Sequence, residues 1–279
     1  MADTGADPHF PKPQTPQIPK TVPHWVLSWV RTNAALVLRE MATRYGRSPG
    51  GYIWAILEPL GMIVILSFGF SLLMRAPSLG TSFILFYATG YLPYAFFQST
   101  SGRAGSALKF SRPLLTYPTV GWFDVMFARL FLNTITSLLI AYLLITGIVV
   151  LTETRVLISP GPIIISFTYA FLLGFGVGLV NCVLIGFFPV WSSIWSIITR
   201  PLFLASGIIV LYDELPQFAQ TLLWWNPLVH VTALSRAGFY SMYQPDWVSH
   251  VDVLGIGLTL VFFGMLFMRR YHSEILERN

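Results

Sequence analysis

The chain has 279 residues, of which 54% are hydrophobic and 10% are charged, whereas an average soluble domain is about 25% charged. A soluble core of this length could not bury so much apolar surface, so the composition excludes an ordinary soluble protein and indicates an integral membrane protein. The net charge of +5 does not indicate a nucleic-acid partner, because the basic residues lie in short loops beside apolar segments, where they report membrane topology.

The chain begins with a proline-rich segment. Residues 1–23 contain six of the 19 prolines, with polar residues between them, and they lack the apolar core of a signal peptide. A segment of this composition cannot bury enough apolar surface to fold. We therefore expect a disordered tail on the cytoplasmic side.

The next segment, residues 24–47, is predicted to form an amphipathic helix. Small and polar residues recur in it every three or four positions, with apolar side chains between them and with Arg31, Arg39 and Arg44 on its length. This pattern favours a helix that lies in the cytoplasmic membrane interface and is anchored by tryptophans. The alternative is an ordinary packed helix of a small soluble subdomain.

Residues 48–279 are predicted to form one membrane domain with six transmembrane helices. The six apolar segments cover residues 52–74, 81–100, 125–151, 162–188, 191–212 and 253–268. Most of them reach the roughly 20 residues that a bilayer requires. Their apolar runs are continuous, which indicates helices and not the alternating pattern of barrel strands. The predicted fold class is therefore all-α integral membrane.

The basic residues predict how these spans are oriented. Twelve lysines and arginines flank one side of the membrane and three flank the other. Basic loops are retained in the cytoplasm during insertion. Both termini are therefore expected on the cytoplasmic side.

Four small residues recur at every fourth position of the fourth span, namely Gly174, Gly178, Cys182 and Gly186. They share one helix face and would let another helix approach closely. We interpret them as a packing surface and not as a dinucleotide-binding motif, because no strand precedes them. Cys182 is the only cysteine, so no intrachain disulfide can form.

Two arginines fall inside predicted spans, where a charge is expensive unless it faces a partner or water. Arg129 lies about one turn into its span, so it can reach the membrane surface or pair with Asp124. Arg200 lies near the middle of its span, directly before Pro201. Arg200 is therefore the stronger candidate for a functional charge.

The longest extracytoplasmic segment precedes the last span. Its two apolar pieces, residues 218–225 and 229–243, are too short to cross a bilayer. Asn226 and Pro227 lie between them and form a natural break. The segment predicts short re-entrant or interfacial helices.

The chain lacks the motifs of an enzyme. It contains no Gly-x4-Gly-Lys-Ser/Thr phosphate loop, and its five histidines lack metal-ligand spacing. Glu58 is the only carboxylate at membrane depth, which disfavours an ion-coupled carrier. We therefore predict a transport subunit without catalytic residues, metal site or cofactor of its own, either channel-like or driven by a separate ATPase.

Two stretches carry a resemblance to a known family. Residues 44–60 read Arg-Tyr-Gly-x-Ser-x-x-Gly-Tyr-x-Trp-x-x-x-Glu-Pro-Leu, and residues 200–207 are followed by Asn-Pro-Leu-Val-His and a further arginine. This resembles the membrane subunits of type-2 ABC exporters, which export capsule and O-antigen polysaccharides. The residues that match the family pattern are Arg44, Tyr45, Gly46, Glu58, Pro59, Asn226, Pro227, His230 and Arg236. One departure is Ala233, where the family often has an acidic residue.

The resemblance implies a permease subunit in the bacterial inner membrane. Such permeases act as homodimers with two copies of a separate ATPase subunit, which binds ATP and Mg²⁺, and they move a lipid-linked polysaccharide. The motifs favour the capsule branch, whose members also meet periplasmic and outer-membrane export proteins. The alternatives are a permease for O-antigen or a teichoic-acid type polymer, or a non-ABC channel or carrier.

Aromatic residues are the candidates for the lining of the export route. Their ring faces suit sugars without fixing one hydroxyl pattern, and an arginine suits acidic sugars or a lipid-linked phosphate. A stripe at steps of four, four and three residues along the second span is joined by rings near the cytoplasmic ends, and the full set is Phe83, Tyr87, Tyr91, Tyr94, Tyr52, Trp54, Trp191, Trp195 and Arg200. The alternative is that the tryptophans and tyrosines only anchor the spans at the interfaces.

The loop between the second and third spans, residues 102–122, is the only substantial internal cytoplasmic loop. An ATP-driven permease must offer its ATPase a surface, so we predict that this loop couples the two subunits. The candidate contacts are Arg103, Ser106, Lys109 and Arg112. Simple retention of positive charge in the cytoplasm explains these basic residues equally well.

Overall fold

The computed structural model describes residues 24–45, 51–117, 120–152 and 156–278. These parts of the chain are helical and contain no strand. In chain order the elements are α1 (His24–Tyr45), α2 (Tyr52–Ser71), α3 (Phe83–Gly105), α4 (Ala107–Ser111), α5 (Trp122–Thr152), α6 (Pro160–Phe187), α7 (Trp191–Leu204), the 3₁₀ turn η1 (Tyr212–Glu214), α8 (Gln217–Leu223), α9 (Pro227–Phe239) and α10 (His250–Arg278). The predicted all-α class is confirmed. The predicted tail, residues 1–23, lies outside the described residues.

Four helices within the described residues are long and apolar enough to cross a membrane, namely α2, α5, α6 and α10. Two further predicted spans correspond to α3 and α7, which do not meet that standard. The helix α3 has 23 residues but ends on a polar segment that includes Arg103, and α7 has only 14 residues. The two short helices predicted before the last span are present as α8 and α9.

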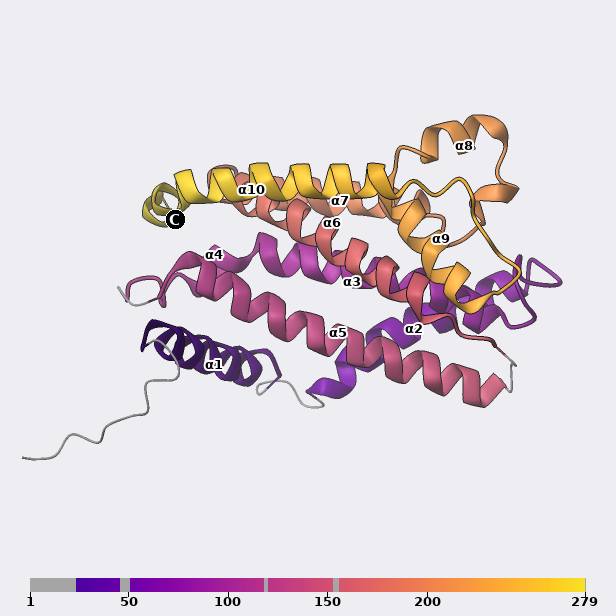
Figure 1. Ribbon diagram of the computed structural model, residues 1–279, viewed down its shortest axis with the longest axis horizontal. Helices are drawn as coiled ribbons and strands as arrows, with labels where there is room; N and C mark the ends of the chain where they lie inside the picture. Colours follow the sequence, from indigo (N-terminus) through magenta and orange to yellow (C-terminus); the bar gives the residue numbers. More distant parts are fainter. Residues whose placement is uncertain (1–23, 46–50, 118–119, 153–155, 279) are drawn as a thin grey trace, which may run out of the picture.

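The long helices run roughly side by side, with α1 and α4 at one end and α8 and α9 at the other (Figure 1). The helix α6 lies at the centre, where it packs against α3, α9 and α10. A side chain on Gly174 would come within 2.7 Å of the Phe97 carbonyl oxygen of α3, and one on Gly178 within 2.9 Å of the Ser101 carbonyl oxygen. The prediction of a small-residue packing face is confirmed for these two glycines, whereas Gly186 faces α10.

The predicted span 191–212 is wrong in its second half, because α7 ends at Leu204. Gly207 has a φ angle of 68°, a left-handed conformation that ends helical hydrogen bonding and that glycine adopts without strain. The carbonyl oxygens of residues 205–208 therefore need donors from elsewhere.

Three side chains from α9 and its N-cap supply those donors. The Asn226 amide donates to the carbonyl oxygen of residue 205 at 2.8 Å, and the Thr232 hydroxyl donates to that of residue 206 at 2.8 Å. The Arg236 guanidinium donates to the carbonyl oxygens of residues 207 and 208 at 2.6 and 2.7 Å. The break in α7 is thus stabilised by hydrogen bonds from one neighbouring helix.

A similar arrangement supports α3. Pro93 lies inside this helix and has no N–H, so the carbonyl of Thr89 loses its donor. The Ser235 hydroxyl of α9 donates to that oxygen at 2.7 Å. The helix α9 therefore binds carbonyl oxygens that both α3 and α7 leave without a helical partner.

At the other end of the molecule, α1 packs against α5. Of the two alternatives given for Arg129, the pairing with Asp124 is contradicted. Arg129 forms an ion pair with Glu40 of α1, with 3.2 Å between Nε and Oε1, and Asp124 accepts a hydrogen bond from the indole of Trp29 at 2.8 Å. The docking of α1 brings Glu40 within reach of Arg129 and leaves Asp124 for Trp29. Whether α1 also lies in a membrane interface stays a prediction.

Candidate functional site: a polar cavity between α2, α3 and α5

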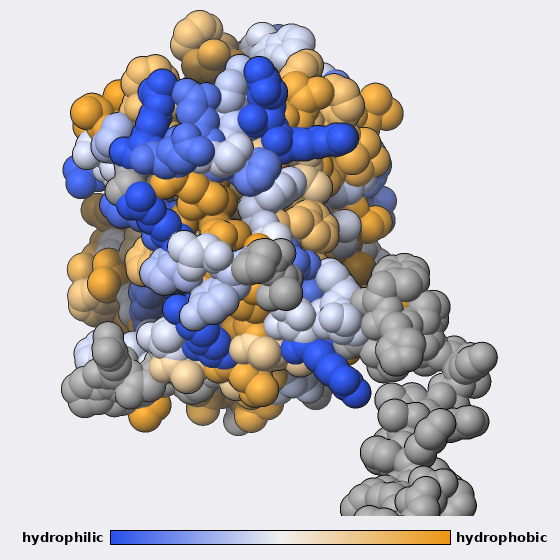
Figure 2. Space-filling model, turned by 90° about the vertical axis from the view of Figure 1, so that its left-hand side faces the viewer, coloured by the Kyte–Doolittle hydropathy of each residue, from blue (hydrophilic) through white to orange (hydrophobic). Residues whose placement is uncertain are grey.

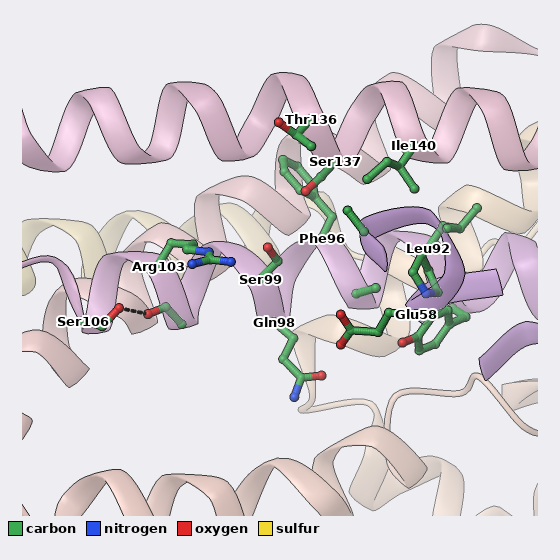
Figure 3. A pocket seen from close by; sticks show the side chains of 15 residues that line it. Glu58, Leu92, Phe96, Gln98, Ser99, Arg103, Ser106, Thr136, Ser137 and Ile140 are labelled. Atoms are coloured by element: carbon green, nitrogen blue, oxygen red, sulfur yellow. Dashed lines mark hydrogen bonds between the residues drawn. The ribbon is translucent and has the colours of Figure 1, made fainter. Parts of the chain in front are cut away.

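A cavity of about 440 Å³ lies between α2, α3 and α5 (Figure 3). Its polar lining residues are Glu58, Tyr91, Gln98, Ser99, Arg103, Ser106, Thr136 and Ser137. The three helices around it otherwise expose mainly apolar side chains. A polar cavity inside such a bundle is a candidate pathway or binding site, because polar groups at membrane depth line water-filled spaces or contact polar ligands.

The helix α2 contributes a carboxylate and a backbone acceptor. Glu58 is exposed to the cavity, and its carboxylate points into it (Figure 3). Pro59 follows within the helix and has no N–H, so the carbonyl of Ala55, four residues earlier, has no helical donor. Ala55 and Pro59 both line the cavity. The cavity thus has two hydrogen-bond acceptors on α2, the Glu58 carboxylate and the Ala55 carbonyl that Pro59 leaves without a donor.

The helix α3 contributes one face. Tyr91, Ser99 and Arg103 line the cavity at steps of eight and four residues, which places them on the same side of a helix. The hydroxyl of Ser99 donates to Asn133 Oδ1 of α5 at 2.7 Å. This bond joins α3 to α5 at the back of the cavity.

The cavity holds one acidic and one basic side chain that are not joined. Among the described residues the ion pairs are Glu40–Arg129 and Glu274–Arg278, so Glu58 and Arg103 form none there. Figure 3 shows them on different helices, with Gln98 and Ser99 between them. Carboxylate, guanidinium, amide and hydroxyl groups together offer donors and acceptors to a ligand rich in hydroxyl groups.

The predicted aromatic stripe is only partly at this cavity. Tyr91 lines it, whereas Tyr87 and Tyr94 are each 1% exposed. The ring of Tyr87 packs against Phe70 of α2 at 5.4 Å. The Tyr94 hydroxyl donates to a carbonyl oxygen of α7 at 3.1 Å. Phe83 is partly buried against the same core. A role of these residues in the export route stays a prediction.

Four of the remaining route candidates lie outside the cavity. Trp54 is exposed on α2, and the Trp191 indole donates to Asn181 Oδ1 of α6 at 2.8 Å. Trp195 is half-buried and Arg200 is exposed, both on α7. The side chain of Tyr52 is not among those that the structure describes. Among the described side chains, Trp54, Trp191, Trp195 and Arg200 therefore do not line the cavity with Tyr91.

The coupling candidates divide between the cavity and the surface. Arg103 and Ser106 line the cavity, whereas Lys109 and Arg112 are exposed in and just after α4. Figure 2 views the end of the molecule that carries α1, α4 and the C-terminal part of α10, and hydrophilic side chains cover much of this face. One stretch of 10 residues, 103–112, thus connects the cavity with this hydrophilic end.

The residues of the family pattern also divide. Glu58 and Pro59 are at the cavity, whereas Asn226, Pro227, His230 and Arg236 are at α9. The structure does not describe the side chains of Arg44 and Tyr45, and it does not describe Gly46 at all.

His230 is buried in α9 as a neutral imidazole. Its Nε2 lies 2.8 Å from the Trp224 carbonyl oxygen, which can only accept, and its Nδ1 accepts the N–H of Ser249 at 3.3 Å. Burial lowers the pKa of His230, as expected when desolvation disfavours the charged form. His230 therefore connects α9 to the segments on either side of it.

Sequence reasoning missed several cavity residues, namely Gln98, Ser99, Thr136 and Ser137. The helical spacing from Tyr91 through Ser99 to Arg103 is a signal that could have found the α3 face. No comparable spacing marks the face of α5, where Thr136 and Ser137 are adjacent in the chain.

Comparisons with known proteins identify a family and several relatives. The chain matches the family described as ABC-2 type transporter over residues 32–240. It is 30% identical over 245 residues to the polysialic acid transport protein KpsM of Escherichia coli, covering 88% of this chain and 95% of that protein. It is 28% identical over 247 residues to the capsule polysaccharide export inner-membrane protein BexB of Haemophilus influenzae, covering 86% and 91%.

A more distant relative carries a different name. The O-antigen export system permease protein RfbA of Klebsiella pneumoniae is 25% identical over 246 residues, covering 85% of this chain and 92% of that protein. The family match extends from α1 to the residue after α9 and therefore includes both the cavity and the α7–α9 contact. The chain belongs to the ABC-2 type transporter family.

Proposed function

We propose that the chain is the permease subunit of an ATP-driven exporter that moves a lipid-linked capsular polysaccharide across the bacterial inner membrane. The observation that carries this proposal is the similarity, over most of both chains, to relatives named for polysialic acid and capsule transport, at 26–30% identity. The polar cavity supports it, because a glycan needs hydrogen-bond donors and acceptors where it crosses an apolar bundle.

We propose six membrane crossings, formed by α2, α3, α5, α6, α7 and α10. The helix α3 is largely buried among its neighbours, so its polar face need not meet lipid, and this explains why its mean hydropathy is lower. The helix α7 is short, and the broken segment 205–211 continues it toward η1. An even number of crossings puts both termini on one side, and the exposed Lys109, Arg112, Arg269 and Arg270 favour the cytoplasm for that side.

The proposal includes a second copy of the chain. The helix α2 exposes a row of large apolar side chains, namely Ile53, Leu57, Val64, Ile65 and Phe68, and within the chain it packs mainly against α3. A second copy that covers α2 and α7 would place two polar cavities near one central route. Such an arrangement gives a hydrated polymer more room than one bundle offers.

The energy source in this proposal is a separate ATPase, which binds ATP and Mg²⁺ and contacts α4. The exposed Lys109, Phe110 and Arg112 supply the surface for that contact. The chain itself is proposed to hydrolyse nothing, because it contains no phosphate-binding loop. Periplasmic and outer-membrane export proteins are proposed as further partners.

The test is export of surface polysaccharide in cells that lack this gene. The wild-type chain should restore the capsule, and Glu58→Gln and Arg103→Ala should reduce export at normal membrane abundance. Arg75→Ala, which changes an exposed arginine outside the cavity, is the matched control and should leave export unchanged. Loss of O-antigen with an intact capsule in the deletion strain would favour the O-antigen branch, and full export by both cavity variants would contradict the assigned role of the cavity.

A further inference from the structure

A second cavity, of about 500 Å³, lies between α5 and α6. Its lining is aliphatic and aromatic apart from threonines, and it consists of Phe96, Thr134, Leu138, Ala141, Tyr142, Ile145, Thr146, Ile158, Ile163, Ile164, Phe167, Thr168, Phe171 and Phe239. The rings of Phe167 and Phe171 lie 5.8 and 6.3 Å from that of Phe96, which reaches between the two helices from α3. We call this cavity the α5–α6 groove.

The groove has the length of one membrane leaflet. Its α5 lining extends from Thr134 to Thr146, which at 1.5 Å per residue corresponds to about 18 Å. Half of the hydrocarbon core of a bilayer is about 15 Å. Because Ile158 and Phe239 also line it, the groove lies in the half of the molecule that carries α8 and α9 (Figure 1).

The groove opens on the outer surface of the molecule. The helices α5 and α6 are both long and apolar enough to cross a membrane. Three lining side chains are strongly exposed, with Leu138 at 41%, Tyr142 at 67% and Ile164 at 64% of their surface. The Thr168 hydroxyl donates to the carbonyl of Ile164 at 2.7 Å, whereas the buried Thr134 hydroxyl has no hydrogen-bond partner among the described residues.

The volume distinguishes between possible occupants. A helix with its side chains is about 10–12 Å wide and rises 5.4 Å per turn, so the groove would hold roughly one turn of a partner helix. A methylene group takes about the volume of a water molecule, roughly 30 Å³, so the same space holds about sixteen methylene groups. That is the length of a phospholipid acyl chain, and such chains surround every spanning helix.

We propose that the α5–α6 groove is a binding site for one acyl chain of a bilayer phospholipid, in the leaflet on the side of α8 and α9. The chain lies between two helices that leave this space unfilled and contacts the phenylalanine rings at its base. The inference requires only that α5 and α6 cross a bilayer, so it stands or falls separately from the exported cargo.

The experiment uses the purified chain, without ATPase or glycan, in vesicles of phosphatidylethanolamine and phosphatidylglycerol that carry a diazirine on one acyl chain. After illumination, mass spectrometry locates the labelled residues. We expect labelling of Leu138, Tyr142 and Ile164 to exceed labelling of exposed α5 residues outside the groove by at least several-fold. The comparison residues are Ile135, Leu139 and Leu143, which are 50%, 54% and 47% exposed. Equal labelling of both sets would identify ordinary boundary lipid and overturn the proposal.

A pair of variants on α6 provides the second measurement. Ile164→Trp places a large ring at the mouth of the groove and should lower groove labelling several-fold. The neighbouring Ile165→Trp changes an exposed residue outside the groove and should leave it unchanged. Groove labelling that persists in Ile164→Trp would contradict the site. Preferential labelling by a polyisoprenyl phosphate probe over the phospholipid would overturn the assigned ligand class.

Discussion

Two buried arginines at opposite ends of the molecule are stabilised by different kinds of partner. Arg129 is 3% exposed and pairs with the carboxylate of Glu40, which a separate helix supplies. Arg236 is 1% exposed and contacts two carbonyl oxygens of the broken segment and the ring of Phe86, 4.1 Å from its guanidinium carbon. Among the described residues no carboxylate forms an ion pair with Arg236.

The difference indicates how each end depends on its arginine. At the α1 end, Arg129 pairs with a carboxylate and also donates to the Ser106 carbonyl oxygen at 3.2 Å, so the ion-pair part of its interactions can be exchanged between the two side chains. At the α9 end, the acceptors are backbone groups that are available only because α7 is broken there. The break and Arg236 therefore depend on one another, and no substitution in the partner segment can compensate for the loss of the guanidinium.

The largest expected effect is that of Arg236→Leu. It leaves two carbonyl oxygens without donors in a buried place, and each unsatisfied buried polar group typically costs about 1–3 kcal/mol. We expect low membrane abundance and a clearly lower thermal unfolding temperature in detergent. Arg236→Lys should recover only part of the loss, because an ammonium lacks the planar fork. An unfolding temperature for Arg236→Leu equal to that of the control Arg75→Leu would refute the assigned role.

A smaller effect is expected at the α1 end. Arg129→Leu leaves Glu40, whose side chain is 19% exposed, without its partner, at a cost of about 1–3 kcal/mol. Here the reciprocal exchange Arg129→Glu with Glu40→Arg should recover part of the stability that each single change loses. The measurement is a double-mutant cycle on thermal unfolding. Strict additivity of the two single changes would mean that the ion pair contributes nothing.

The smallest effect concerns Ser235. Ser235→Ala leaves the Thr89 carbonyl without a donor and should cost about 1 kcal/mol. Pro93→Ala restores a backbone N–H to the same carbonyl, so Ser235→Ala should cost less in a Pro93→Ala background. If Ser235→Ala lowers the stability equally in the wild-type and Pro93→Ala backgrounds, Ser235 does not act by binding the Thr89 carbonyl.

The continuous apolar runs predicted most of the long helices, because apolar length alone identifies a span. The break in α7 was missed for a physical reason. Residues 191–212 read as one apolar run, and Gly207 adopts its left-handed conformation in contact with α9, whose residues come more than 20 positions later in the chain. The local signals, Pro201 and Gly207, permit a helix end but do not require one.

The candidate site was predicted in part. Tyr91, Glu58 and Arg103 were chosen for three separate reasons, as a route aromatic, a family-motif residue and a coupling residue, and the structure brings them together. Tyr87 and Tyr94 share the same spacing but are buried, because α3 is covered on several faces and helical periodicity cannot tell which face meets a cavity. For Arg129 the sequence offered Asp124 as one alternative partner, whereas its actual partner, Glu40, lies 89 positions away.

The most direct test of the cavity as part of the export route is protection of a cysteine by the polymer. Gln98→Cys places a thiol on an exposed position of the cavity lining, Ser241→Cys places one on an exposed loop outside it, and the native Cys182 is buried. In export-competent cells, a water-soluble maleimide should react more slowly with Gln98→Cys when the polysaccharide is being made than when its synthesis is blocked. The rate at Ser241→Cys should not change. Equal rates at Gln98→Cys in both conditions, with export intact, would contradict the proposal that the glycan passes this cavity.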